Sequence, residues 1–108
     1  MVRGRRGRPS KLDAVRLERL TWLLAHGMDR SAVAHEVGIG RATFYRWLHD
    51  DRPDFDALRK AVLRAEAEAE AAVTWNIVHR SKTDWRAGMA WLQARYPERW
   101  PPQRRSQH

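Results

Sequence analysis

Hydrophobic residues recur at helical spacing along most of the chain, and no segment shows the alternation of a β-strand. Leucines from Leu12 to Leu24 predict a first helix. We expect it to begin after Ser10, to carry Asp13 in its first turn and to end at Gly27. Two short helical stretches follow, and the second ends at about residue 49. The first half of the chain therefore predicts three helices.

The second half of the chain predicts two longer helices. A polar break at residues 50–53 is followed by Asp54, in the first turn of a helix that we expect to run to about residue 79. Its centre is rich in Ala and Glu, which have high helix propensity. A turn at residues 81–83 and a helix at residues 85–96 follow, and prolines then end the regular structure. The whole chain is therefore expected to be all-α.

Residues 30–49 carry the pattern of a helix-turn-helix motif. This motif needs a glycine at the turn, a small residue where the two helices cross, and apolar residues facing inward. Gly38 is in place for the turn, and Ala34 precedes it by four positions. The apolar positions around that glycine are filled by Val33, Val37, Ile39, Phe44 and Trp47. An ordinary helical hairpin would not require this combination.

The second helix of such a motif lies in the major groove of duplex DNA. Arg41 and Arg46 would point outward there and could either bind guanine O6 and N7 or hold phosphates. Ala42 could meet a thymine methyl group. The full set of candidate DNA contacts on this helix is Arg41, Ala42, Thr43, Tyr45, Arg46 and His49.

Charge strengthens the case for a nucleic-acid partner. The 108 residues include 21 Lys and Arg against 13 Asp and Glu, a net charge of +8. Five cations stand before the first helix without an intervening acid: Arg3 and the four candidate DNA contacts Arg5, Arg6, Arg8 and Lys11. Residues 5–9 resemble the core of an AT-hook, in which Arg-Gly-Arg-Pro follows a narrow minor groove. The alternative is a basic tail that binds DNA without regard to sequence.

The two C-terminal helices predict a surface for self-association. Apolar and small residues follow three-four spacing along the longer helix, and the last helix offers a complementary apolar face. A single antiparallel pair of this kind would expose much aromatic surface, so we expect subunits to meet here. The alternative is that this pair of helices folds back on the three N-terminal helices. The candidate interface residues are Phe55, Leu58, Val62, Ala65, Ala69, Ala72, Trp85, Met89 and Leu92.

These patterns together predict an N-terminal helix-turn-helix head of three helices followed by an antiparallel helical hairpin. The expected organisation is a basic AT-hook-like arm at residues 1–11, a DNA-binding domain at 12–52, an oligomerisation hairpin at 53–96 and a basic, proline-containing tail at 97–108.

Enzymatic function is not expected. Cysteine is absent, and the five histidines lack metal-ligand spacing, so we expect neither a metal site nor a cofactor. The stretch from Gly38 to Gly40 lacks the lysine of a phosphate-binding loop. The Asp residues between 50 and 56 lie at helix ends, where capping accounts for them. No apolar run reaches the length of a membrane span, and no secretion signal is visible.

Three stretches of the chain resemble the small terminase subunits of tailed bacteriophages and prophages. They are GRPSK at residues 7–11, GIGRATFYRW at 38–47, and DW at 84–85 together with WLQARYPERW at 91–100. The resemblance implies a cytoplasmic protein of an infected bacterium that recognises viral DNA, forms a ring through its helical hairpin and delivers the DNA to a large terminase subunit. It also implies DNA recognition by Arg41, Thr43, Tyr45 and Arg46. Many members carry a further C-terminal segment that engages the motor, and little follows Tyr96 here.

Two other functions fit the same residues. One is a small transcriptional regulator that binds a palindrome as a dimer. The other is the DNA-binding subunit of a transposase or recombinase whose catalytic centre lies on another chain.

Overall fold

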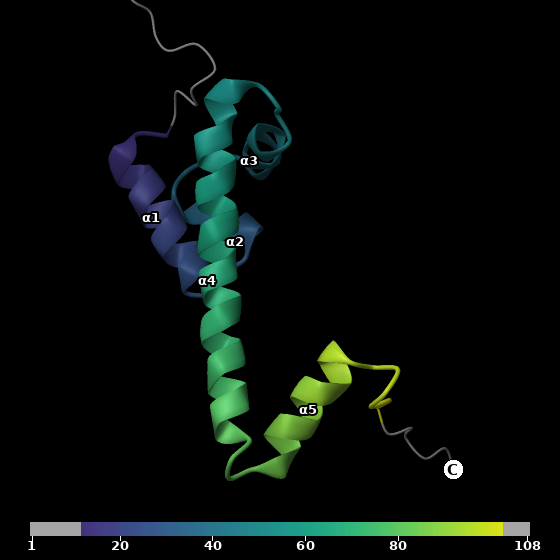
Figure 1. Ribbon diagram of the computed structural model, residues 1–108. Coiled ribbons are helices and arrows are strands. Elements are labelled where there is room, and N and C mark those ends of the chain that lie inside the picture. Colours follow the sequence, from purple (N-terminus) through teal and green to yellow (C-terminus); the bar gives the residue numbers. More distant parts are fainter. Residues whose placement is uncertain (1–11, 103–108) are drawn as a thin grey trace, which may run out of the picture. The chain divides into compact units, whose positions relative to one another are not determined.

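The computed structural model describes residues 12–102, and this part of the chain is helical without strands, which confirms the all-α prediction (Figure 1). The helices in chain order are α1 (Ala14–Ala25), α2 (Arg30–Glu36), α3 (Arg41–Leu48), the 3₁₀ turn η1 (Pro53–Phe55), α4 (Asp56–Arg80) and α5 (Trp85–Arg95). None of these helices is long and apolar enough to cross a membrane.

The chain divides into two compact units, residues 1–70 and residues 71–108. The boundary falls within α4, so the first part of this helix belongs to the first unit and its last turns belong to the second. We call the described part of the first unit, residues 12–70, the head.

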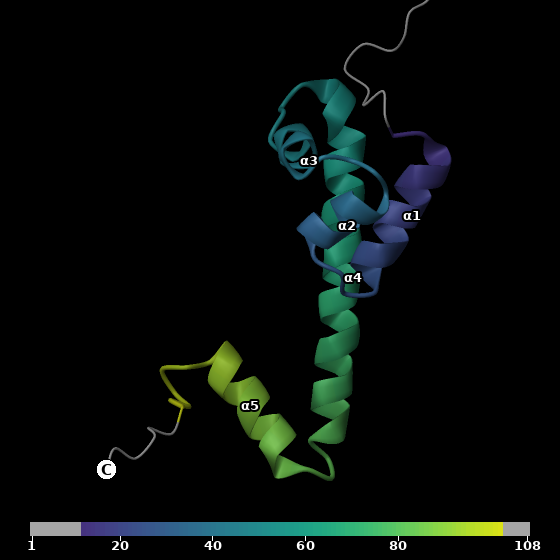
Figure 2. The ribbon, with the colours of Figure 1, turned by 180° about the vertical axis from the view of Figure 1, so that it is seen from behind.

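The head is built from four helices around one hydrophobic core. Figures 1 and 2 show α1, α2 and α3 gathered along the first part of α4. Phe44, Leu20, Leu24, Val33 and Val62 are its largest fully enclosed side chains, and they come from all four helices. The structure thus adds one helix to the three-helix head that the sequence predicted.

Four residues expected at a subunit interface lie instead in this core. Phe55, Leu58, Val62 and Ala65 are each at most 5% exposed and pack with the buried residues of α1, α2 and α3. The reason is that the three short helices cannot enclose their own apolar faces, and the apolar stripe of α4 covers them. These four residues therefore belong to the head.

The start of α1 also differs from expectation. Asp13 is the N-cap of this helix, and its Oδ1 accepts a hydrogen bond from the backbone N–H of Arg16 at 2.8 Å. The helix therefore begins later than a start directly after Ser10 would give. Its end is as predicted, since Gly27 follows with φ +97°, a conformation that favours glycine.

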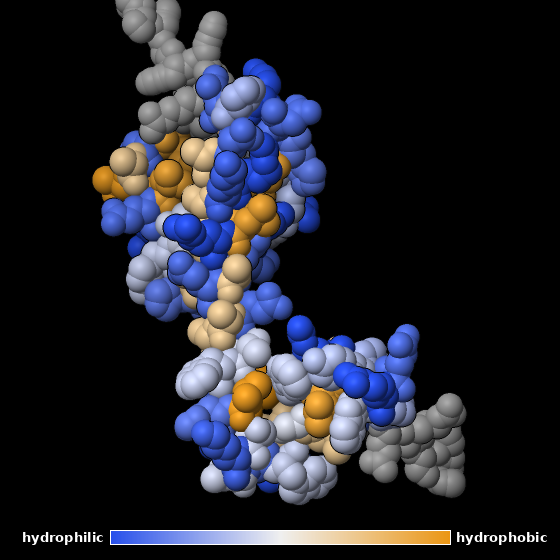
Figure 3. Space-filling view, viewed as in Figure 1, coloured by the Kyte–Doolittle hydropathy of each residue, from blue (hydrophilic) through white to orange (hydrophobic). Residues whose placement is uncertain are grey.

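The second unit contains the last turns of α4 and the whole of α5, which Asp84 caps by accepting from the N–H of Arg86 at 3.1 Å. Among residues 71–102, no side chain is buried. Trp85 is 71% exposed and Trp75 is 68% exposed, and Figure 3 shows hydrophobic side chains open to solvent on this unit. This unit alone does not enclose a hydrophobic core.

Candidate nucleic-acid interface

The turn between α2 and α3 is built as the motif requires. Gly38 has φ +77°, and the N–H of Ile39 donates to the carbonyl of Ala34 at 2.8 Å. Ala34 is fully buried, which lets the backbones of the two helices approach closely. The predicted inward-facing residues are all buried: Val33, Val37, Ile39, Phe44 and Trp47.

Helix α3 has one buried face and one exposed face. Phe44, Trp47 and Leu48 are enclosed in the head. The six predicted DNA contacts all lie on α3 or at its C-cap: Arg41, Ala42, Arg46 and His49 are exposed, and Thr43 and Tyr45 are half-buried. The structure therefore brings these six together on one short segment, and their contacts with DNA stay a prediction.

Arg41 is held on two sides. Its Nε donates to Oγ of Ser31 at 2.7 Å, and its guanidinium carbon lies 5.2 Å from the centre of the Tyr45 ring. Ser31 belongs to α2, and the sequence analysis did not select it. No sequence pattern indicates this contact, because it depends on how the turn brings two side chains together.

His49 ends α3. Its backbone N–H donates to the carbonyls of Tyr45 and Arg46, and its Nδ1 lies 2.9 Å from the backbone carbonyl oxygen of Tyr45. The imidazole therefore already contacts the end of its own helix.

An ion pair fixes the motif to the long helix. The Nε and Nη2 atoms of Arg30 bind the two carboxylate oxygens of Glu66 at 2.7 and 2.8 Å. This side-chain hydrogen bonding raises the pKa of Arg30 above its ordinary value, against the opposing effect of burial. The paired geometry ties α2, which opens with Arg30, to α4.

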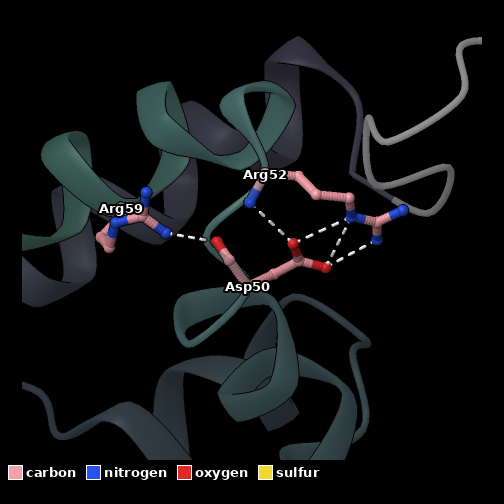
Figure 4. Close-up of polar contacts among 3 residues, drawn as sticks. All are labelled: Asp50, Arg52 and Arg59. Carbon is pink, nitrogen blue, oxygen red and sulfur yellow. Dashed lines mark hydrogen bonds and ion pairs between the residues drawn. The ribbon is translucent and has the colours of Figure 1, made fainter.

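A second polar cluster closes the link between α3 and α4 (Figure 4). The Asp50 carboxylate accepts hydrogen bonds from the guanidinium and the backbone N–H of Arg52, and these lower the pKa of Asp50 to about 2. Arg59 donates to the Asp50 carbonyl and also binds the carboxylate of Asp56. These two acids therefore serve the local structure.

Within residues 12–102, no three His, Asp or Glu side chains are grouped to hold a metal ion.

The four predicted DNA contacts of the arm, Arg5, Arg6, Arg8 and Lys11, lie outside the described residues. Their contribution to the interface rests on the sequence alone.

The left-handed turn at Gly38, the enclosed anchors and the exposed face of α3 define a small helix-turn-helix DNA-binding protein. The comparison with known families agrees, since residues 7–51 match the family model described as the helix-turn-helix domain of resolvase. No curated protein and no solved structure matches the chain.

Proposed function

We propose that the protein binds a specific site on duplex DNA, with α3 in the major groove. The observation that supports this most is the exposed face of α3, which presents Arg41 and Arg46 while Phe44 and Trp47 anchor the opposite face. The buried anchors hold the helix at a fixed position on the head, as recognition of base edges requires.

The test is the affinity of the Arg46→Ala variant for DNA. Loss of a base contact should weaken binding to the preferred sequence by about 1–3 kcal/mol and affect other sequences less. The preferred sequence is first selected from a random duplex pool. Arg64→Ala, which removes an exposed cation from α4, is the matched control and should leave affinity nearly unchanged. Unchanged affinity after substitution of both Arg41 and Arg46 would refute the role of α3.

We propose further that the arm binds DNA beside the head. Its cations, Arg5, Arg6, Arg8 and Lys11, favour the negative potential of a narrow minor groove. Removal of residues 1–9 should weaken binding and lower its dependence on salt. A larger loss on A·T-rich than on G·C-rich duplex supports the hook, and an equal loss supports a sequence-independent tail.

Self-association through the second unit is the next part of the proposal. The support is that residues 71–102 bury no side chain and leave Trp85 largely exposed. Ala72, Met89 and Leu92 of this unit remain candidates for the same interface, as does Ala69 at the end of the head. Trp85→Glu should reduce the mass measured by light scattering. Trp22→Glu, at an exposed tryptophan of the head, is the control and should not change the mass.

For the biological role, we propose a small terminase subunit that recognises viral DNA and passes it to a large subunit. The support is the sequence resemblance, which spans most of the chain and is most distinctive at residues 38–47. A closed ring of about eight or more subunits in native mass spectrometry would favour this role.

The second candidate is the DNA-binding subunit of a recombinase or transposase. The match of residues 7–51 to the resolvase helix-turn-helix model supports it. A dimer in native mass spectrometry would favour this role or that of a transcriptional regulator. Binding to a chain that carries the catalytic centre would then separate the two.

A further inference from the structure

We propose that Arg41 is a phosphate clamp that Ser31 and Tyr45 hold in place, so that Arg46 reads bases and Arg41 does not. This inference rests on the proposed binding of α3 to duplex DNA. It assigns Ser31 and Tyr45 as positioning residues. It also gives different roles to Arg41 and Arg46, which the sequence pattern does not distinguish.

The direction of the Arg41 side chain supports the phosphate assignment. In a helix-turn-helix, the first helix crosses the DNA backbone and the second enters the groove. Ser31 lies in the first turn of α2, and its Oγ accepts from Arg41 Nε at 2.7 Å. The guanidinium is therefore drawn from α3 towards the helix that crosses the phosphates.

The donors that remain on Arg41 suit a phosphate. Ser31 uses Nε, which leaves the N–H groups of the two Nη atoms for an anion. Within the described residues no carboxylate forms an ion pair with Arg41, so its charge is not neutralised inside the chain. Arg30, on α2, differs because Glu66 binds it through both oxygens.

Tyr45 completes the support. It follows Arg41 by four positions on α3, and its ring lies 5.2 Å from the guanidinium carbon, within the range of a cation–π contact. A side chain held in this way has already lost rotamer freedom before DNA arrives. The conformational entropy that Arg41 loses on binding DNA is therefore smaller.

The experiment measures affinity for a labelled pool of random-sequence duplexes over a series of salt concentrations. Arg41→Gln should weaken binding and lower the slope of log affinity against log salt by about one unit, as expected for one phosphate contact. Ser31→Ala should weaken binding about two- to tenfold. Neither variant should change the melting temperature.

One rescue variant and two double variants separate positioning from other roles. Ser31→Thr keeps the hydroxyl and should keep the affinity. Tyr45→Leu removes the ring and should weaken binding less once Arg41→Gln is present, because part of its effect is through that guanidinium. Ser31→Ala should have no further effect once Arg41→Gln is present, because its only proposed action is through that guanidinium.

Three results would overturn the inference. Ser31→Ala could weaken binding equally in the wild type and in the Arg41→Gln variant, or Tyr45→Leu could do so. Arg41→Gln could also change the sequence selected from the pool, which would make Arg41 a base reader. If Arg41→Gln has no effect while Arg46→Ala weakens binding, only this inference fails. If neither has an effect, the proposed use of α3 fails as well.

Discussion

Truncation of Leu58 tests whether the first part of α4 belongs to the head. This leucine is 5% exposed, and its replacement by alanine removes three carbons from the core. At about 0.8 kcal/mol per buried carbon, the loss is about 2.4 kcal/mol, and the cavity raises it to about 3–5 kcal/mol. For a unit of this size, each kcal/mol lowers the melting temperature by about 4–8 °C.

The matched control is Leu63→Ala, the same substitution in the same helix at a side chain that is 53% exposed. Its effect on stability should stay within about 0.5 kcal/mol. Urea unfolding of the full chain, followed by circular dichroism at two protein concentrations, measures both variants. The reasoning is refuted if the two variants lose equal stability. It is also refuted if the loss from Leu58→Ala depends on protein concentration, because that would place the side chain between subunits.

Three further results are expected. Gly38→Ala should cost about 1–2 kcal/mol in thermal unfolding, because alanine is strained at φ +77°; an unchanged melting temperature would contradict this. Alanine substitutions of Arg30 and Glu66 in a double-mutant cycle should give a coupling of about 1 kcal/mol that falls with added salt, and a coupling of zero would show that the pair does not stabilise the head. Asp50→Asn should lower the melting temperature at neutral pH. Arg52 lowers the Asp50 pKa from 3.8 to about 2, so the ionised carboxylate stabilises the folded chain fully above about pH 4 and loses this effect as the pH falls through about 2. The difference in melting temperature between variant and wild type should therefore shrink over that range.

The helix-turn-helix could be predicted because its determinants are local. Gly38 specifies a left-handed turn, and the apolar residues that pack against each other lie within about ten positions of it. Each of these positions can be recognised by its residue type alone. The exposed face of α3 then follows from helical periodicity, since Phe44 and Trp47 fix which side is buried.

The packing of α4 could not be predicted in the same way. Its apolar stripe indicates that one face is covered, but periodicity carries no information on which surface covers it. Leu58 and Val62 suit a subunit seam and the core of a head equally well by sequence, and the structure places both in the core. The hydrogen bond between Ser31 and Arg41 was missed for a related reason, because it joins two helices through side-chain geometry.

The position of unpaired cations is more informative about DNA binding than the net charge of +8. Arg30 and Arg52 bind carboxylates of their own chain, at 2.7 and 2.6 Å. A phosphate would have to displace those acids, so these arginines offer little net gain on binding DNA. Arg41 and Arg46 form no ion pair within the described residues, and both are exposed on α3. Contact with phosphate at such cations releases counterions without breaking an ion pair, so under the proposed binding mode the salt dependence should come from cations such as those of α3 and the arm rather than from Arg30 and Arg52.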